Sequence, residues 1–211
     1  MPADAPSTAA DILDARSGRA PPASLCLQEL MIFHDTEIPG AFAVDLERRD
    51  DERGFFARAW CAEEFAAQGL STRLVQANIS FNASAGTLRG MHFQRAPNEE
   101  AKLVRCTSGA LFDAIVDLRP NSPAYKRWTG IELTAENRRA LYVPEGCAHG
   151  FQTLVDATEI FYLVSEAYAP ESEGGVRWDD PAFGIEWPPA QHRIISPKDA
   201  SWADFDGSPY A

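Results

Sequence analysis

An all-β fold, built as a sandwich or barrel of short strands, is predicted by three features of the sequence. Residues 42–46 alternate between apolar and polar side chains, which is the period of a half-buried strand. Further short runs are rich in β-branched, aromatic and apolar residues, with turn signals such as Ser108-Gly109 between them. The runs follow one another at intervals of about 8–12 residues, a spacing that is typical of sandwiches and barrels.

The elements are expected in a definite order along the chain. Residues 1–24 are mostly Ala, Pro, Ser, Asp and Gly, so a flexible tail is expected there. Residues 25–211 contain no repeat or internal linker and are expected to form one domain. One short helix is expected at residues 62–68, where Gly69 follows as a C-terminal stop. After the strand at 42–46, further strands are expected at residues 103–106, 110–118, 129–133, 140–143 and 159–168.

Two of these strands place polar side chains on a defined face. In the strand at 110–118, the two-residue period puts Asp113 and Asp117 on the same face. An acid on a ligand-facing surface can hold one tautomer of a histidine, although a solvated outer face accounts for both acids equally well. In the last predicted strand, the same period puts Tyr162 and Tyr168 on one face. A tyrosine hydroxyl can donate a proton to a carbanion or enolate.

Charge and composition argue against several classes of function. The 211 residues include 19 Lys and Arg against 31 Asp and Glu, and the formal net charge is −12. Proteins that bind nucleic acid usually carry a basic surface, so no nucleic-acid partner is expected. No apolar run approaches the roughly 18 residues of a membrane helix, so no membrane partner is expected either.

A cytoplasmic location is expected from the cysteines and from the start of the chain. The cysteines lie far apart and form no C-x-x-C pair, so reduced thiols are expected: they are Cys26, Cys61, Cys106 and Cys147. The first residues lack the basic and apolar segments of a signal peptide, and they carry acids that a transit peptide avoids.

His92 and His149 are the first candidates for chemistry. His92 follows Gly90 closely, in a segment that also holds Arg89 and leads to Lys102. Polar groups this dense between apolar strands must be solvated, paired or functional, since burying an unpaired polar group costs about 1–3 kcal/mol. The residues alone leave two other interpretations open. His92 could be a core histidine satisfied by one backbone carbonyl, and His149 could be a turn histidine that faces water.

A metal site is disfavoured by the number of available ligands. A protein metal site usually draws three or four close-set ligands, such as His and carboxylate side chains. His92 has no neighbouring histidine, and the two other histidines, His34 and His192, lie in polar surroundings near the ends of the chain.

Six ordered segments carry a resemblance to a known family. They are residues 76–80 (QANIS), 86–94 (GTLRGMHFQ), 102–106 (KLVRC), 141–151 (LYVPEGCAHGF), 178–181 (WDDP) and 195–199 (ISPKD). The order of these segments and their residue identities closely resemble those of the dTDP-4-dehydrorhamnose 3,5-epimerase family of sugar-nucleotide enzymes. The resemblance runs from about residue 53 to residue 199.

The resemblance implies a fold, a reaction and a partner. The implied fold is a cupin-type jelly roll, a double-stranded β-helix, with one or two short helices. Family members act as homodimers, need no cofactor and invert carbons 3 and 5 of a 4-keto-6-deoxy sugar nucleotide. The implied partner is therefore a sugar nucleotide, linked to dTDP. Inversion next to a ketone needs a base on one face of the sugar, a proton donor on the other, and a cation near the ketone oxygen.

The same resemblance assigns roles to particular residues. His92 matches the base and pairs with Asp199, while Tyr162 matches the proton donor on the opposite face. Lys102 matches the cation that stabilises the enolate oxygen. His149 and Asp113 match a second polar pair that shapes the site. The other matches are to residues that hold the substrate, namely Arg53, Gln76, Asn78, Arg89 and Tyr168.

Three positions depart from the common pattern of the family and bear on the choice of substrate. Arg58 stands where an acid is usual, Leu163 follows Tyr162 where lysine is frequent, and Ala167 replaces an aromatic residue before Tyr168. An altered pocket leaves open a single-carbon epimerase that acts on a different sugar nucleotide.

Two alternatives come from other classes of protein. One is a non-catalytic jelly roll that binds a sugar nucleotide. The intact His, Lys, Tyr and Asp set argues against it, because binding alone requires no base and no acid. The other is a metal-dependent cupin enzyme, which the ligand count disfavours.

Overall fold

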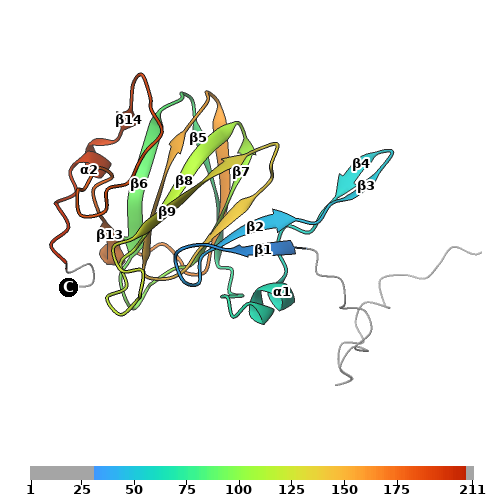
Figure 1. Cartoon of the computed structure of the whole chain (residues 1–211), viewed down its shortest axis with the longest axis horizontal. Coiled ribbons are helices and arrows are strands. Elements are labelled where there is room, and N and C mark those ends of the chain that lie inside the picture. The colour runs from blue at the N-terminus through green and yellow to red at the C-terminus, as the bar shows by residue number, and fades with distance from the viewer. Residues whose placement is uncertain (1–30, 208–211) are drawn as a thin grey trace, which may run out of the picture.

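Two facing β-sheets form the body of the protein in the computed structural model, which describes residues 31–207 (Figure 1). The predicted tail at residues 1–24, and the boundary that follows it, lie outside the described residues. The all-β prediction is confirmed, and the facing sheets enclose a jelly-roll core, as the resemblance implies. No helix among residues 31–207 is long and apolar enough to cross a membrane.

The first sheet has six strands in the order β1-β2-β10-β7-β12-β5. Their bounds are Met31–Asp35 for β1, Phe42–Leu46 for β2, Ala140–Val143 for β10, Lys102–Ser108 for β7, Thr158–Val164 for β12 and Gln76–Asn82 for β5. All of these neighbours pair in the antiparallel sense. The sheet therefore joins strands that are far apart in the sequence, such as β5 and β12.

The second sheet runs in the order β13-β6-β11-β8-β9, and β14 lies parallel to β6. Their bounds are Glu173–Gly175 for β13, Thr87–Gln94 for β6, Cys147–Thr153 for β11, Ala110–Asp117 for β8, Trp128–Thr134 for β9 and Ile194–Ile195 for β14. Two short helices, Ala62–Ala67 (α1) and Pro197–Ala200 (α2), and a 3-10 turn at Pro170–Ser172 complete these elements. The helix predicted at residues 62–68 is confirmed as α1.

The core lies between the two sheets and is closed on the outside by two coverings. The inner cluster takes Val104 and Ile160 from the first sheet and Leu111, Ile115 and Phe151 from the second. Outside the second sheet, apolar side chains of β6, β8 and β11 pack against the segment that follows β13. Outside the first sheet, α1 packs its one buried side chain, Phe65, against β7 and β10. Burial on both faces explains why several strands read as nearly continuous apolar runs.

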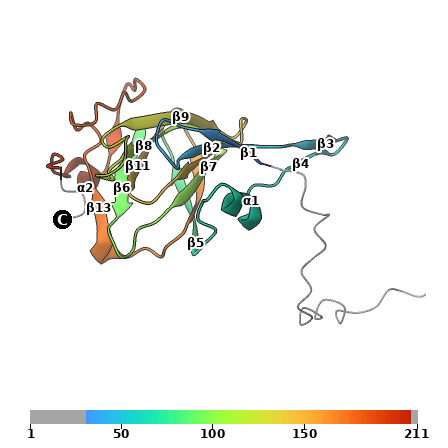
Figure 2. The ribbon, with the colours of Figure 1, turned by 60° about the horizontal axis from the view of Figure 1, so that its bottom comes forward.

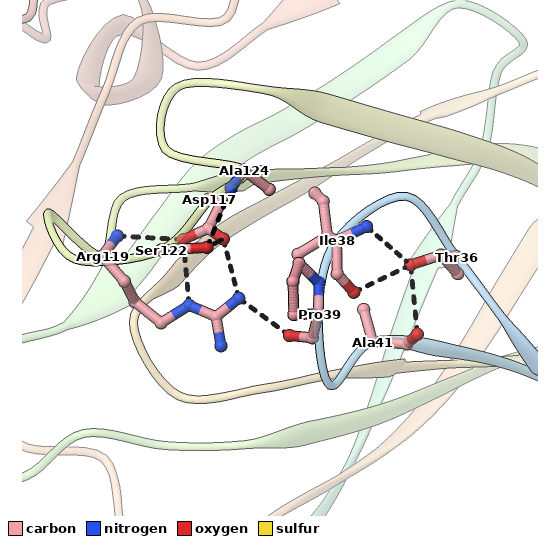
Figure 3. Close-up of polar contacts among 8 residues, drawn as sticks. All are labelled: Thr36, Ile38, Pro39, Ala41, Asp117, Arg119, Ser122 and Ala124. Carbon is pink, nitrogen blue, oxygen red and sulfur yellow. Dashed lines mark hydrogen bonds and ion pairs between the residues drawn. The ribbon is translucent and has the colours of Figure 1, made fainter.

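The predicted faces of β8 are confirmed, and its two acids have different partners. Asp113 and Asp117 are both fully buried. Arg119 donates to both carboxylate oxygens of Asp117, at 2.9 and 2.7 Å, and to the carbonyl of Pro39 at 2.8 Å (Figure 3). Burial alone would raise the pKa of Asp117, but the bonds from Arg119 and Ser122 hold it below its ordinary value. Asp117 therefore holds Arg119 in place, and Arg119 anchors the turn between β1 and β2.

The expected strand at 159–168 is too long, and Tyr168 is not on it. β12 ends at Val164, and the chain bends at Ser165 and Glu166. The bend is held by hydrogen bonds to a distant segment, because Ser165 exchanges bonds with the backbone of Ala101 at 2.8 and 3.0 Å. The prediction that Tyr162 and Tyr168 share one strand face is therefore wrong.

A separate hairpin stands out from the body of the protein. Strands β3 (Arg49–Asp51) and β4 (Gly54–Phe56) pair only with each other and extend away from both sheets (Figures 1 and 2). Arg53 lies in the turn at its tip, with 84% of its side chain exposed. The side chain of Arg53 bonds to Asp51 of the same hairpin at 2.6 Å.

Candidate active site

A cavity of about 230 Å³ lies between the two sheets. Strands of the first sheet contribute Ser80, Lys102, Ile160 and Tyr162, and strands of the second contribute Arg89, His92, His149 and Phe151. Phe151 and Ile160 belong to the inner apolar cluster, whereas the other lining side chains carry polar groups. The cavity therefore combines an apolar floor with a ring of potential acids, bases and cations, which is the usual make-up of a small-molecule site.

His92 forms an acid–base pair with Asp199 at this cavity. Its Nε2 lies 2.7 Å from Asp199 Oδ1, and the side chains are 36% and 6% exposed. Burial would raise the pKa of Asp199, but the bonds from His92, Gly90 N–H and Ser196 lower it below the ordinary value. An ionised carboxylate only accepts hydrogen bonds, so Nε2 of a neutral His92 carries the proton. Its Nδ1 is then the basic atom.

The C-terminal segment brings Asp199 to this position. β14 pairs with the start of β6, and α2 follows at once, with Ser196 capping the helix at Asp199 N. The backbone N–H of Gly90 also reaches Asp199 Oδ2, at 3.3 Å. A residue 107 positions away from His92 is thereby placed beside its ring.

A second histidine pair stands next to the first. His149 on β11 is the register partner of His92 on β6, so the two residues sit directly opposite on neighbouring strands. His149 Nε2 lies 2.6 Å from Oδ1 of the fully buried Asp113. The water-facing interpretation of His149 is therefore wrong, because its side chain is only 12% exposed and is paired inside the fold.

Arg89 and Asn78 line or flank the same cavity. The Arg89 guanidinium donates to Asn82 Oδ1 at 2.8 Å, and Asn82 is itself buried. Asn78 is the register partner of Tyr162 and lies two residues before the lining residue Ser80. By the period of a strand, Asn78, Ser80 and Asn82 share the inner face of β5.

The remaining predicted binding residues are not among those that line the cavity. Gln76 accepts a hydrogen bond from Tyr168 N at 2.8 Å, which ties β5 to the segment after β12. Tyr168 is 58% exposed, and its hydroxyl bonds to Glu173 at 3.1 Å. Arg53, at the tip of the hairpin, does not line the cavity of its own chain.

Comparison with known proteins gives this arrangement a family. Residues 35–207 match the family model described as dTDP-4-dehydrorhamnose 3,5-epimerase. The chain belongs to the dTDP-4-dehydrorhamnose 3,5-epimerase family. A relative of that name from Salmonella typhimurium is 43% identical over 173 residues, which cover 82% of this chain and 94% of the relative.

Two solved structures of epimerases share the fold. A dTDP-6-deoxy-D-glucose-3,5-epimerase from Legionella pneumophila, in complex with dTDP-4-keto-L-rhamnose, superposes with a TM-score of 0.76 at 36% identity. The match covers 82% of this chain and 91% of that one. A 3′-monoepimerase from Streptomyces bikiniensis, in complex with dTDP-quinovose, also gives a TM-score of 0.76, at 32% identity. That match covers 83% of this chain and 88% of that one.

The departures from the epimerase pattern have local structural explanations at two positions. Arg58 donates to Glu64 of α1 at 2.8 Å, so it ties the hairpin stem to the helix. Leu163 packs in the apolar cluster outside the first sheet and faces away from the cavity. Ala167 is exposed, and its carbonyl accepts a bond from Gln94 at 3.2 Å. Nothing in the structure explains why alanine stands there.

Three residues of this epimerase site were missed in the sequence. Asn82 orients Arg89. Asn82 could have been found from the sequence, because it lies two residues after Ser80 on an alternating strand and therefore shares its face. Glu173 accepts bonds from Tyr168 and from Lys198 Nζ, the latter at 2.6 Å, on the strand that pairs beside His92. Lys198 directly precedes Asp199, so its place near the site could have been inferred from that of Asp199. Among residues 31–207, no group of three or more His, Cys, Asp or Glu side chains is arranged to hold a metal ion.

Proposed function

We propose that the chain is an isomerase that inverts carbons 3 and 5 of dTDP-4-dehydro-6-deoxyglucose. The observation that carries the proposal is the placement of a paired base and a phenol on facing sheets of one cavity. His92 stands on the second sheet and is paired with Asp199 of α2, and Tyr162 stands on the first sheet. Lys102 is the cation that the first sheet contributes to the cavity lining, and its ammonium is suited to stabilise negative charge on the ketone oxygen.

In this mechanism each inversion is one proton removed and one proton added. His92 takes the proton from the carbon next to the ketone, and the C–H electron pair moves into the enolate. The ammonium of Lys102 stabilises the negative oxygen. Tyr162 then gives its proton to the opposite face of the carbon, and solvent restores the phenol and the neutral imidazole. A second round at the other carbon beside the ketone completes the reaction.

Deuterium incorporation tests the reaction directly. The protein is incubated in heavy water with dTDP-4-keto-6-deoxyglucose, and the sugar is read by NMR and mass spectrometry. Two deuterons, at carbons 3 and 5, are the expected result. One deuteron would identify a single-carbon epimerase, like the Streptomyces bikiniensis relative. No deuterium would contradict epimerisation and favour a non-catalytic binding protein.

We also infer that the epimerase is a homodimer in which the hairpin of one copy reaches the cavity of its partner. Phe56 on the hairpin is 66% exposed, and Ile79 and Phe81 on the edge strand β5 are 65% and 58% exposed. Large apolar side chains on a projecting hairpin and an edge strand favour burial against a second copy. Arg53 at the hairpin tip would then bind phosphate at the partner's cavity.

Complementation between two inactive variants tests this dimer. Mixed Arg53→Ala and His92→Asn chains, unfolded and refolded together, are expected to regain about a quarter of the wild-type activity, because half of the dimers then contain one intact site. Sedimentation shows whether dimers form. A monomer at micromolar concentration, or a mixture as inactive as its parts, would contradict the arrangement.

A cytoplasmic location belongs to the same proposal. Among the described residues, Cys61, Cys106 and Cys147 are free thiols, and burial raises the pKa of Cys147 to about 12. Free thiols are usual in a reducing compartment.

A further inference from the structure

We propose that Glu100 is a positioning residue of this active site, which directs the ammonium of Lys102 at the ketone oxygen. The proposal rests on the function proposed above and adds a residue to it. Its starting point is an ion pair between Glu100 Oε1 and Lys102 Nζ. Both side chains are nearly buried, at 11% and 10% exposed, so this pair is not a solvated surface contact.

The backbone around Glu100 is fixed on both sides. Ala101, the next residue, exchanges two hydrogen bonds with Ser165, at 2.8 and 3.0 Å. The preceding loop is tied down by Gln94, whose amide donates to the carbonyl of Asn98 at 2.9 Å. The carboxylate of Glu100 is therefore held by an ordered segment and acts as a fixed partner for Lys102.

A fixed partner determines where the other N–H groups of Lys102 point. Glu100 lies two residues before Lys102, the first residue of β7, and its carboxylate contacts the ammonium of Lys102 directly. A lysine ammonium has three N–H donors and a flexible stem. Glu100 occupies one donor, and the remaining donors are available to the cavity that Lys102 lines. Without this partner, the stem could adopt several rotamers, and the cation would no longer be pre-aligned.

Glu100 also acts on Tyr162. Burial raises the pKa of the Tyr162 phenol, the negative charge of Glu100 raises it further, and Arg89 acts in the opposite direction. The neutral phenol is the form that can donate a proton, so Glu100 favours the reactive form of Tyr162. The other charged or titratable groups that line this cavity are Arg89 and His92 on β6, Lys102 on β7 and His149 on β11.

The direction of the pH effect follows from this charge. Tyr162 donates only below its pKa, so kcat falls as pH rises through that value. Removing the negative charge of Glu100 lowers the pKa of Tyr162. The alkaline limb of the kcat profile must then move to lower pH.

Glu100→Gln tests the proposal, with Glu99→Gln as its matched control. Both changes remove one carboxylate from adjacent residues, but Glu99 acts on Glu145, whereas Glu100 is the ion-pair partner of Lys102 and the acid that acts on Tyr162. We expect kcat of Glu100→Gln to fall by about 10–100-fold, because a misplaced group loses alignment with the substrate. Its alkaline limb should move to lower pH, while Glu99→Gln should match the wild type. Thermal unfolding checks that both variants fold.

Glu100→Asp separates position from charge. Aspartate keeps the negative charge near Tyr162 but is one methylene shorter, so it should leave the alkaline limb near that of the wild type while kcat still falls. If the wild type is active and Glu100→Gln has the same kcat and pH profile, the role of Glu100 is overturned and the proposed function stands. Equal losses in Glu99→Gln and Glu100→Gln would also overturn the role of Glu100. A wild type that incorporates no deuterium would instead overturn the proposed function, and the role of Glu100 with it.

Discussion

Replacement of His92 by asparagine is expected to abolish epimerisation, with kcat lower by at least about 10²–10⁴-fold, the usual contribution of a general base. The amide of asparagine cannot take a proton from carbon, so no enolate forms. Deuterium should therefore disappear from both carbons of the sugar, as well as from recovered substrate. NMR of the sugar after incubation in heavy water measures the loss, with purified His92→Asn at the concentration of the wild type.

The chain contains a matched control for this variant. His34 also pairs with an aspartate, Asp45, at 3.0 Å, but its side chain is 51% exposed and lies outside the cavity. His34→Asn removes the same chemical group from a similar pair and should retain wild-type turnover. A His92→Asn protein that still exchanges deuterium at the wild-type rate would show that another residue is the base.

Replacement of Tyr162 by phenylalanine is expected to stop inversion while leaving deuterium exchange in place. The ring still fills its place, but no proton donor faces the enolate from the first sheet. His92 can then only return a proton to the face from which it came. Formation of the inverted sugar should fall by about 10²–10⁴-fold. Deuterium should still enter the uninverted substrate, and NMR distinguishes the two sugars.

Tyr125→Phe is the control for this change. The Tyr125 hydroxyl donates to the carbonyl of Gly207 at 3.3 Å, remote from the cavity lining. Its loss should leave both inversion and exchange unchanged. If Tyr162→Phe lost exchange together with inversion, Tyr162 would be needed to form the enolate, and the assignment of His92 as the only base would be wrong.

The sequence predicted the strands best where alternation was strict. In β8 the period of two placed Asp113 and Asp117 on one face, and the structure shows that this face is the inner, buried one. The prediction failed at the end of β12, because the bend at Ser165 depends on hydrogen bonds to Ala101, a residue far away in the chain. Apolar composition continues past that bend, so no local signal marked it.

The sequence predicted which residues belong to the candidate site, but not how they are arranged in space. The family resemblance named His92 and Asp199, yet nothing local in the sequence shows that they lie 2.7 Å apart. The ion pair of Glu100 with Lys102 was also missed, although the two residues are only two positions apart. An acid near a lysine is a common surface pattern, and only the burial of the pair in the fold distinguishes this one.

The docking of the C-terminal segment on β6 has a consequence for the synthesis and lifetime of the protein. During translation, β13 emerges well before Asp199, so the strands of both main sheets except β14 can associate while the base still lacks its partner. The chain also passes through an exposed stretch at residues 189–192 before it reaches β14. Such stretches are preferred sites of proteolytic nicking. A single cut there would leave the sheets assembled and attach Asp199 only by non-covalent contacts, so the enzyme would lose activity before it lost its fold.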